Sequence, residues 1–515
     1  MAVATAVLLN GDDLTIGDVW SVAVGRAPAA LSDEGRTRMA AARELVDRAA
    51  SESSGEHTYG INTGFGRFVS KAIPPELSEE LQLRLLRSHA CGVGEPYADE
   101  IVRAAMVLRA NALAKGFSGA RIETVELLLE CLNRGVLPYV PSRGSVGASG
   151  DLAPLAHLAL PLVGEGSATY DGEVVPGAEA LTRAGLEPVR LQAKEGLSLV
   201  NGTQFMGAVG ALGLVRAFRI AKSADIACAL SVEALQGSSV SFMPEIHALR
   251  HLRGQSASAA NVLRLLEGSA INAAHRWCDK VQDAYSLRCA PQVHGASRDL
   301  LDYVEHTVAV EVNAATDNPL VLVDRGELVS NGNFHGQPVA LALDSMAIAL
   351  AELASISERR VERLVNPSLS DGLPAFLTHD GGLNSGFMIP QYVAAALVSE
   401  NKVLCHPASV DSIPTSAGQE DHVSMGNAAG LKCWTVLANV ERALAIELLA
   451  AAQGVEFLAP LEPGAGAKAA HDHVRSISPT VLEDRSLAPD IELVAESIRS
   501  GALVGAVEAE VGELA

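Results

Sequence analysis

The tripeptide Ala148-Ser149-Gly150 lies in the stretch 143-RGSVGASGDLAPLAHLAL-160, between a glycine-rich loop and an apolar run. A backbone amide nitrogen can attack the carbonyl carbon two residues earlier only where the chain bends tightly and no side chain blocks it. Gly150 as nucleophile and Ala148 as acceptor meet that requirement, because glycine has the lowest steric cost in a strained turn. Loss of water from the ring and from the Ser149 hydroxyl then leaves a methylidene conjugated to an imidazolone. Such a group is an electrophile made from the chain itself, although Ala-Ser-Gly alone is also a common loop tripeptide.

Seven polar clusters stand in apolar or glycine-rich surroundings elsewhere in the sequence. They are 57-HTYGINTGFG-66, 88-SHACGVG-94, 194-KEGLSLVNGTQ-204, 281-VQDAYSLRCAPQ-292, 316-TDNPLV-321, 331-NGNFHGQP-338 and 419-QEDHVSMG-426. They supply phenols, imidazoles, a guanidinium, carboxylates and amides, from Tyr59, Tyr285, His89, His335, His422, Arg288, Glu420, Asp421, Asn201 and Gln282. Each cluster alone is also compatible with a hydrogen-bonded structural role. As a set they indicate a site that holds a small zwitterion and moves a proton.

The common catalytic signatures are missing from the sequence. It has no G-x-S-x-G elbow, no P-loop, no H-E-x-x-H, and no G-x-G-x-x-G after a strand. His247 and His251 have the spacing of two metal ligands on a helix, and His471 and His473 flank an aspartate, but neither pair has a third ligand nearby. The sequence therefore predicts solvated histidines and no metal site.

The composition and charge of the 515 residues exclude several classes of protein. There are 39 basic and 61 acidic residues, a net charge of −22, which argues against a nucleic-acid or anionic-membrane surface. Seven cysteines are spread singly, a pattern typical of reduced thiols in the cytoplasm. The N-terminus lacks a basic segment before its short apolar run, and no uncharged apolar stretch reaches the roughly 18 residues of a membrane span.

Helices must position these groups, since the chain is 48% hydrophobic but only 4% aromatic and its interior must be built mainly from Ala, Leu and Val. Residues 1–200 mix short helical segments with glycine-rich turns, and residues 201–515 read as a central helical bundle with C-terminal helices. In 431–453, Leu437, Val440, Leu444 and Leu448 recur at helical spacing. The stretch 338–365 is apolar nearly all round in its first half, which predicts burial in a bundle, against other chains as well as its own. Residues 459–470 are expected to form an irregular connection.

The motif 147-GASGDLAPLAH-157 resembles the prosthetic-group signature of the histidine ammonia-lyases, within the superfamily of aromatic amino acid ammonia-lyases and aminomutases. The seven polar clusters have counterparts there in the same order, so the resemblance covers at least residues 50–460. It implies that Ala148, Ser149 and Gly150 form 4-methylideneimidazole-5-one (MIO) autocatalytically, with Asp151 assisting, and that no external cofactor is needed.

The resemblance also implies a role for each of the other candidate residues. Tyr59 would remove the β-proton of the substrate, and Asn201 would hold the prosthetic group or the substrate near it. The substrate carboxylate would be bound, and the pocket completed, by Gln282, Tyr285 and Arg288. Phe334 would line the pocket beside the prosthetic group. His89 and Glu420 match the histidine-specific branch, in which they lie near the substrate imidazole; a carboxylate there accepts from an imidazole N–H.

The family fold is mainly α, of the fumarase/aspartase-like type, with an N-terminal part that carries MIO and a long central bundle. Its members are homotetramers in which each active site takes residues from three chains, so the resemblance implies shared sites here and inactive monomers. From the charge balance and the apolar stretches we expect no nucleic acid and no membrane as partners.

By this resemblance the chain is a carbon–nitrogen lyase that converts L-histidine into trans-urocanate and ammonia, the first step of histidine degradation. Whether the amino group or the imidazole engages the electrophile is left open by the sequence. The alternatives are a tyrosine or phenylalanine ammonia-lyase or 2,3-aminomutase of the same superfamily, against which His89 and Glu420 argue, and a non-catalytic helical assembly protein. His294, where the family pattern leads us to expect a smaller or apolar residue, leaves its effect on substrate choice open.

Overall fold

The computed structural model describes residues 6–51, 59–276 and 280–515. The described residues are mainly helical, as the composition predicts, and their strands are short. The chain packs as two compact units. Unit 1 comprises Met1–Val215, Glu305–Asp344 and Pro407–Leu431, and unit 2 comprises Arg216–Val304, Ser345–His406 and Lys432–Ala515.

The two units differ from the division at residue 200 that we predicted from the change between glycine-rich turns and long helical stretches. Residues 305–344 and 407–431 pack with the N-terminal segment, although they lie far along the chain. The reason is that the chain passes between the units inside long helices. Four helices contain residues of both units, namely α9 (Gln204–Ala234), α14 (Ala290–Glu311), α15 (Gln337–Val365) and α17 (Gly426–Glu456).

Short helices and strands make up the rest of unit 1. The helices are α1 (Ile16–Ala23), α2 (Asp33–Ser51), α3 (Ser78–His89), α4 (Asp99–Ala114), α5 (Ile122–Arg134), α6 (Leu152–Ala159), α7 (Gly177–Arg183) and α8 (Glu195–Val200). The strands are β1 (Val7–Leu9), β2 (Ala29–Leu31), β3 (Val93–Pro96), β4 (Leu137–Pro138), β5 (Pro141–Arg143), β6 (Ser167–Tyr170), β7 (Glu173–Pro176), β8 (Leu320–Leu322) and β9 (Glu327–Val329).

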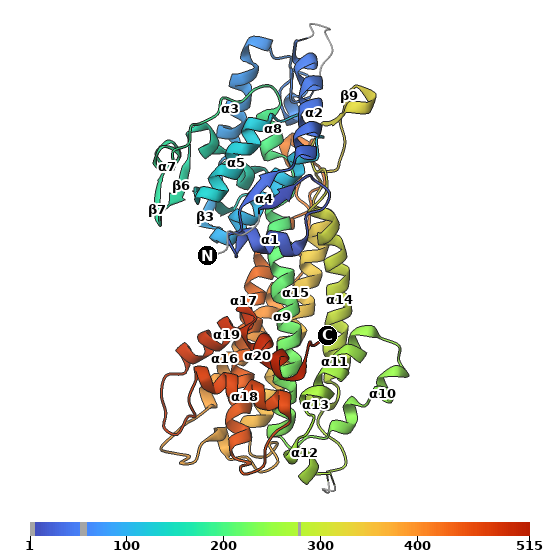
Figure 1. Ribbon diagram of the computed structural model, residues 1–515, viewed down its shortest axis with the longest axis vertical. Coiled ribbons are helices and arrows are strands. Elements are labelled where there is room, and N and C mark those ends of the chain that lie inside the picture. Colours follow the sequence, from blue (N-terminus) through green and yellow to red (C-terminus); the bar gives the residue numbers. More distant parts are fainter. Residues whose placement is uncertain (1–5, 52–58, 277–279) are drawn as a thin grey trace. The chain divides into compact units, whose positions relative to one another are not determined.

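Helix α4 forms the core of unit 1. Every residue from Ile101 to Ala114 is buried, because α1 and α5 pack against it. The strands form small sheets: β1 and β2 pair in parallel, and β3–β5, β4–β6–β7 and β8–β9 pair antiparallel. The β6–β7 hairpin lies with α7 at one edge of the unit (Figure 1). A rigid helical core of this kind can hold glycine-rich loops in fixed positions.

Unit 2 is built around the long helices. Its other helices are α10 (Pro244–Ala248), α11 (Arg253–Leu265), α12 (Ala270–Ala274), α13 (Tyr285–Arg288), α16 (Met388–Leu404), α18 (Ala465–Ile477), α19 (Ala488–Ser500) and α20 (Ala502–Val511). Helices α18, α19 and α20 pack together (Figure 1). On α17, Leu437, Val440, Leu444 and Leu448 are fully buried, so the predicted apolar face is confirmed.

Helix α15 carries the apolar stretch that the sequence places in a bundle. Its mean hydropathy over the most apolar window is 1.8, and by length and composition alone it is the one helix of the described chain that could cross a membrane. Two thirds of that window is buried inside the protein (67%), as in the core helix of a soluble protein. The irregular connection expected at 459–470 is shorter than predicted, because α18 already begins at Ala465.

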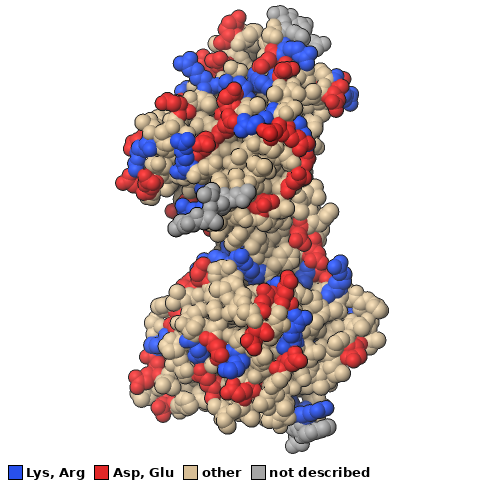
Figure 2. All heavy atoms as spheres, viewed as in Figure 1, with Lys and Arg blue, Asp and Glu red and all other residues tan. Residues whose placement is uncertain are grey.

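Figure 2 shows Lys and Arg interspersed with Asp and Glu over the visible face. Within the described ranges, no group of three His, Cys, Asp or Glu side chains is placed to hold a metal ion. His247 is not solvated as predicted: it is buried, and its ring bonds to the Ser241 carbonyl and the Gln255 amide.

Candidate active site

The Ala148-Ser149-Gly150 tripeptide forms a very tight turn in unit 1. Gly147 and Gly150 both have left-handed backbone conformations, with φ of 73° and 71°, and Ala148 and Gly150 are bridge partners of each other. A Cβ on Gly150 would lie 1.9 Å from the Gly202 carbonyl oxygen, so only glycine fits. The Ser145 hydroxyl closes the turn, donating to the Gly150 carbonyl at 3.2 Å and accepting from the Gly147 amide at 3.1 Å. The tripeptide is therefore held in a tight turn that depends on glycine at positions 147 and 150.

A second segment, which leads into α9, clamps this turn. The Asp151 amide donates to the Gly202 carbonyl at 2.7 Å, and the Gly202 amide donates to the Ser149 carbonyl at 3.3 Å. The Asp151 carboxylate accepts from the Phe205 and Met206 amides at 2.9 and 3.0 Å, at the N-terminus of α9. Burial raises the pKa of Asp151 to about 7, against these hydrogen bonds. A carboxyl group that exchanges a proton near neutral pH thus adjoins the tripeptide.

Buried charges fix Asn201 just before the clamp. The Asp317 carboxylate accepts from the side-chain Nδ2 of Asn201 at 3.1 Å and from Lys194 Nζ at 2.7 Å. The side chains of Lys194 and Asp317 are almost fully buried. Arg109 Nη1 donates to the Asn201 carbonyl at 2.6 Å from the middle of α4. Asn201 Oδ1 is buried without a hydrogen-bond partner in the described structure. Because the rest of Asn201 is held in place, this oxygen is free to accept from a ligand.

Replacing Lys194 by Met is expected to lower the free energy of unfolding by about 3–5 kcal/mol, because Asp317 is left as a buried charge without its ion-pair partner. Lys222 is a suitable control, since its Nζ lies 2.9 Å from Glu508 Oε1 with both side chains about a quarter exposed. Lys222→Met should cost less than about 1 kcal/mol. Urea unfolding followed by circular dichroism measures the free energy of unfolding of both variants. An equal loss of stability in the two variants would contradict a special contribution of the buried Lys194–Asp317 pair.

Tyr59 presents a protonated phenol to the same region. Its ring packs edge-to-face on Phe65 at 6.0 Å between centroids, and its hydroxyl accepts from the Gly66 amide at 3.4 Å. Burial raises the pKa of Tyr59 above its ordinary value, the Gly66 amide opposes this effect, and the nearby Glu420 and Asp317 charges add to it. Loss of its proton therefore requires alkaline pH or an incoming positive charge.

Glu420 and His89 supply polar groups from two further segments. A closed turn over residues 415–420 positions Glu420, with the Thr415 hydroxyl donating to Glu420 Oε2 at 2.6 Å. His89 ends α3, and its Nδ1 lies 3.0 Å from the Leu85 carbonyl. Burial lowers the pKa of His89, so the ring is neutral, Nδ1 carries the hydrogen, and Nε2 is an acceptor.

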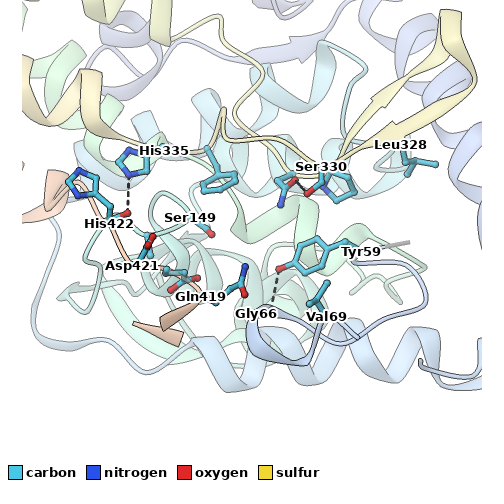
Figure 3. A pocket seen from close by; sticks show the side chains of 15 residues that line it. Tyr59, Gly66, Val69, Ser149, Leu328, Ser330, His335, Gln419, Asp421 and His422 are labelled. Carbon is cyan, nitrogen blue, oxygen red and sulfur yellow. Dashed lines mark hydrogen bonds between the residues drawn. The ribbon is translucent and has the colours of Figure 1, made fainter. Parts of the chain in front are cut away.

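Two adjoining cavities bring most of the predicted residues together. The first, of about 610 Å³, is lined among others by Tyr59, Ala148, Ser149, Phe334 and Glu420. The second, of about 460 Å³, is lined among others by Tyr59, His89, Ser149, Asn201 and Glu420. Figure 3 shows Tyr59 and Ser149 facing the first cavity, with the parallel His335 and His422 rings, 5.8 Å apart, at its rim. A phenol, an imidazole, an amide and a carboxylate thus surround Ser149.

Gln282, Tyr285 and Arg288 belong to unit 2 and form a cluster of their own. Arg288 Nη2 donates to Gln282 Oε1 at 2.9 Å, and Arg288 Nε donates to the Asp283 carbonyl at 2.9 Å. The guanidinium lies 4.6 Å from the centre of the Tyr285 ring, which is 71% exposed. Gln282 and Arg288 line a cavity of about 880 Å³ in unit 2. The three residues predicted to bind the substrate carboxylate therefore lie together and include an exposed ring, but they do not line the cavities around Ser149.

Arg109 has a part in the site that the sequence reasoning missed. It is fully buried, two of its nitrogens have no partner in the described structure, and burial lowers its pKa to about 10. The available signal in the sequence was an arginine surrounded by the apolar residues Val107, Leu108 and Ala110. Lys194 and Asp317 stand in two of the seven polar clusters, but nothing in their spacing indicated that they pair.

Comparisons with known proteins agree with this arrangement. Residues 14–476 match the aromatic amino acid lyase family. The chain is 56% identical to a histidine ammonia-lyase of Gloeobacter violaceus over 507 residues, 98% of each chain. The crystal structure of histidine ammonia-lyase from Trypanosoma cruzi is similar, with a TM-score of 0.91 and 48% identity over 99% of this chain and 96% of that one. The crystal structure of tyrosine aminomutase from Streptomyces globisporus is also similar, with a TM-score of 0.93 and 39% identity over 99% of this chain and 100% of that one. The expected fold is confirmed.

Proposed function

The chain belongs to the aromatic amino acid lyase family, and from that premise we propose that it eliminates ammonia from L-histidine to give trans-urocanate. It is a carbon–nitrogen lyase. The observation that carries the proposal is the meeting of Tyr59, His89, Ser149 and Glu420 around one pair of cavities. An aromatic ring alone would not need the carboxylate, whereas an imidazole N–H has a matching acceptor in Glu420.

Ala148, Ser149 and Gly150 form the MIO group in this proposal. The tight turn, the glycine that admits no Cβ, and the neighbouring Asp151 all suit cyclisation. The group supplies an electrophilic carbon that makes the substrate amine a better leaving group. No external cofactor is required.

The chain's own residues bind the substrate and move its proton. Glu420 accepts from one imidazole N–H and favours the cationic form of the ring, whose second N–H can donate to the acceptor Nε2 of His89. Arg288 and Gln282 hold the substrate carboxylate. Tyr59 removes the β-proton after the substrate is bound, and the low dielectric of the closed site strengthens each of these electrostatic contacts.

The carboxylate-binding cluster of one copy completes the cavity of another copy. The exposure of Tyr285 supports this arrangement, as do the apolar side chains of Leu341 and Ile348 that α15 leaves exposed in a single chain. We propose a homotetramer with shared active sites, so that separated monomers lack activity. The six cysteines described by the structure are free thiols, which fits a cytoplasmic protein.

The test is to mix the purified tetramer with L-histidine, L-tyrosine and L-phenylalanine separately. Urocanate absorbance should rise with L-histidine alone. Cinnamate or coumarate absorbance, or a β-amino acid product, would instead place the chain in the ammonia-lyase or aminomutase branches for phenylalanine or tyrosine. No product from any of the three would leave the non-catalytic assembly as the explanation.

A further inference from the structure

A continuous chain of buried polar groups crosses the interior of unit 2, with His294 at its centre. His294 Nδ1 lies 2.7 Å from Asp225 Oδ1, and Arg298 Nη2 lies 2.7 Å from Asp225 Oδ2. On the other side, His294 Nε2 lies 3.5 Å from Arg360 Nη1. Arg360 is bidentate on Glu447, through Nε at 2.5 Å and Nη2 at 2.9 Å. These groups come from α9, α14, α15 and α17, so the chain of bonds joins all four long helices.

The direction of the hydrogen bonds follows from the charges. Burial lowers the pKa of His294, against the opposing effect of Asp225. Although burial alone would raise it, Arg298 and His294 hold the pKa of Asp225 below its usual range. The imidazole is therefore neutral, donating from Nδ1 to an ionised Asp225 and accepting at Nε2 from Arg360. His294 connects two ion pairs without carrying charge.

This network ends on the turn that carries the carboxylate-binding residues. Arg360 Nη1 also donates to the carbonyl of Ser286 at 3.3 Å, and Ser286 lies between Tyr285 and Arg288 in α13. A helix of four residues has few bonds of its own to fix it. His294 sits in the first turns of α14, which follows α13 directly. The turn is thus tied to the buried network both along the chain and through Arg360.

We propose that Arg360 and His294 are positioning residues, which hold α13 so that Tyr285 and Arg288 present the correct geometry to the substrate carboxylate. This inference rests on the proposed function of that cluster. His294 is fully buried and bonded within unit 2, so it acts on substrate binding through the position of α13. Hydrogen bonds and ion pairs to a carboxylate depend on the placement of their donors, so a displaced α13 would bind the substrate carboxylate less well.

Arg360→Lys is the decisive variant, because lysine keeps the charge opposite Glu447 but cannot also reach Ser286 and His294. Arg216→Lys is a matched control: Arg216 is buried and bidentate on Glu441 of the same helix, at 2.9 and 2.9 Å. Among the described residues it makes no hydrogen bond to α13. Both substitutions weaken a buried Arg–Glu pair, and only one releases the turn.

Arg360→Lys should raise KM for L-histidine about ten-fold with little change in kcat. The inhibition constant of L-histidinol, which has a hydroxymethyl group in place of the carboxylate, should not change. Arg216→Lys should leave both constants at wild-type values. His294→Asn keeps a donor for Asp225 and removes the Nε2 acceptor for Arg360, so it should give a smaller rise in KM. This variant replaces Arg360→Lys as the test if Arg360→Lys fails to fold.

Hydrogen exchange of the peptide 284–290 gives a readout independent of turnover. It should be faster in Arg360→Lys than in the wild type and in Arg216→Lys. Unchanged exchange and unchanged KM, or equal changes with L-histidine and L-histidinol, would overturn the inference. A wild-type tetramer that does not act on L-histidine would refute the proposed function instead, while the exchange rates would still decide whether Arg360 holds α13.

Discussion

Ser149→Ala is expected to lower kcat/KM for L-histidine by at least about 10⁴-fold, an increase in the barrier of more than about 5 kcal/mol. The β-proton of histidine is too weakly acidic for a phenol base unless an electrophile has first engaged the substrate. Without the Ser149 hydroxyl, the tripeptide cannot lose the second water, so no methylidene forms. The surrounding clamp, from Gly202 to Asp151, is made by backbone atoms that the substitution leaves in place.

The matched control is Ser149→Cys. A thiol can leave by the same β-elimination, so this variant should retain measurable activity while Ser149→Ala has none. Difference absorbance of the two variants in the absence of substrate reports whether the conjugated group has formed, and thermal unfolding reports whether the fold is intact. Turnover by Ser149→Ala would show that the electrophile does not come from this tripeptide.

Composition and local periodicity indicated helices, and the resemblance carried by short motifs assigned the candidate site residues. The apolar face of α17 is read directly from the spacing of Leu437 to Leu448, because helical periodicity is a local property. Each polar cluster stood out against apolar or glycine-rich neighbours, and seven of the predicted residues do line the two cavities. Short-range signals were sufficient for the helical face, whereas the choice of site residues also needed the resemblance.

Pairings between distant segments could not be read in the same way. Lys194 and Asp317 are 123 positions apart, and Arg360 and Glu447 are 87 apart. Which buried cation meets which buried carboxylate depends on how the helices pack, and this packing also returns residues 305–344 and 407–431 to unit 1. His294 shows the consequence: the sequence left its effect on substrate choice open, and only the packed structure shows that its ring bonds to Asp225 inside unit 2.

Tyr59→Phe is expected to lower kcat/KM for L-histidine by about 10²–10⁴-fold, the range typical of a lost general base. The substitution keeps the ring that packs on Phe65 and removes only the hydroxyl that accepts from Gly66. The prosthetic group should form normally, so its absorbance should match that of the wild type. Activity equal to the wild type would exclude Tyr59 as the base.

The pH profile separates Tyr59 from other titrating groups. Burial raises the pKa of Tyr59, so below that pKa the phenolate fraction grows about tenfold per pH unit, and kcat/KM should rise with pH across the alkaline range. Site-specific replacement of Tyr59 by 3,5-difluorotyrosine, a more acidic phenol, should move this limb to lower pH. A limb that belongs to the substrate ammonium group would stay in place, because the substitution does not alter the substrate. A profile that fails to move would therefore assign proton abstraction to another group.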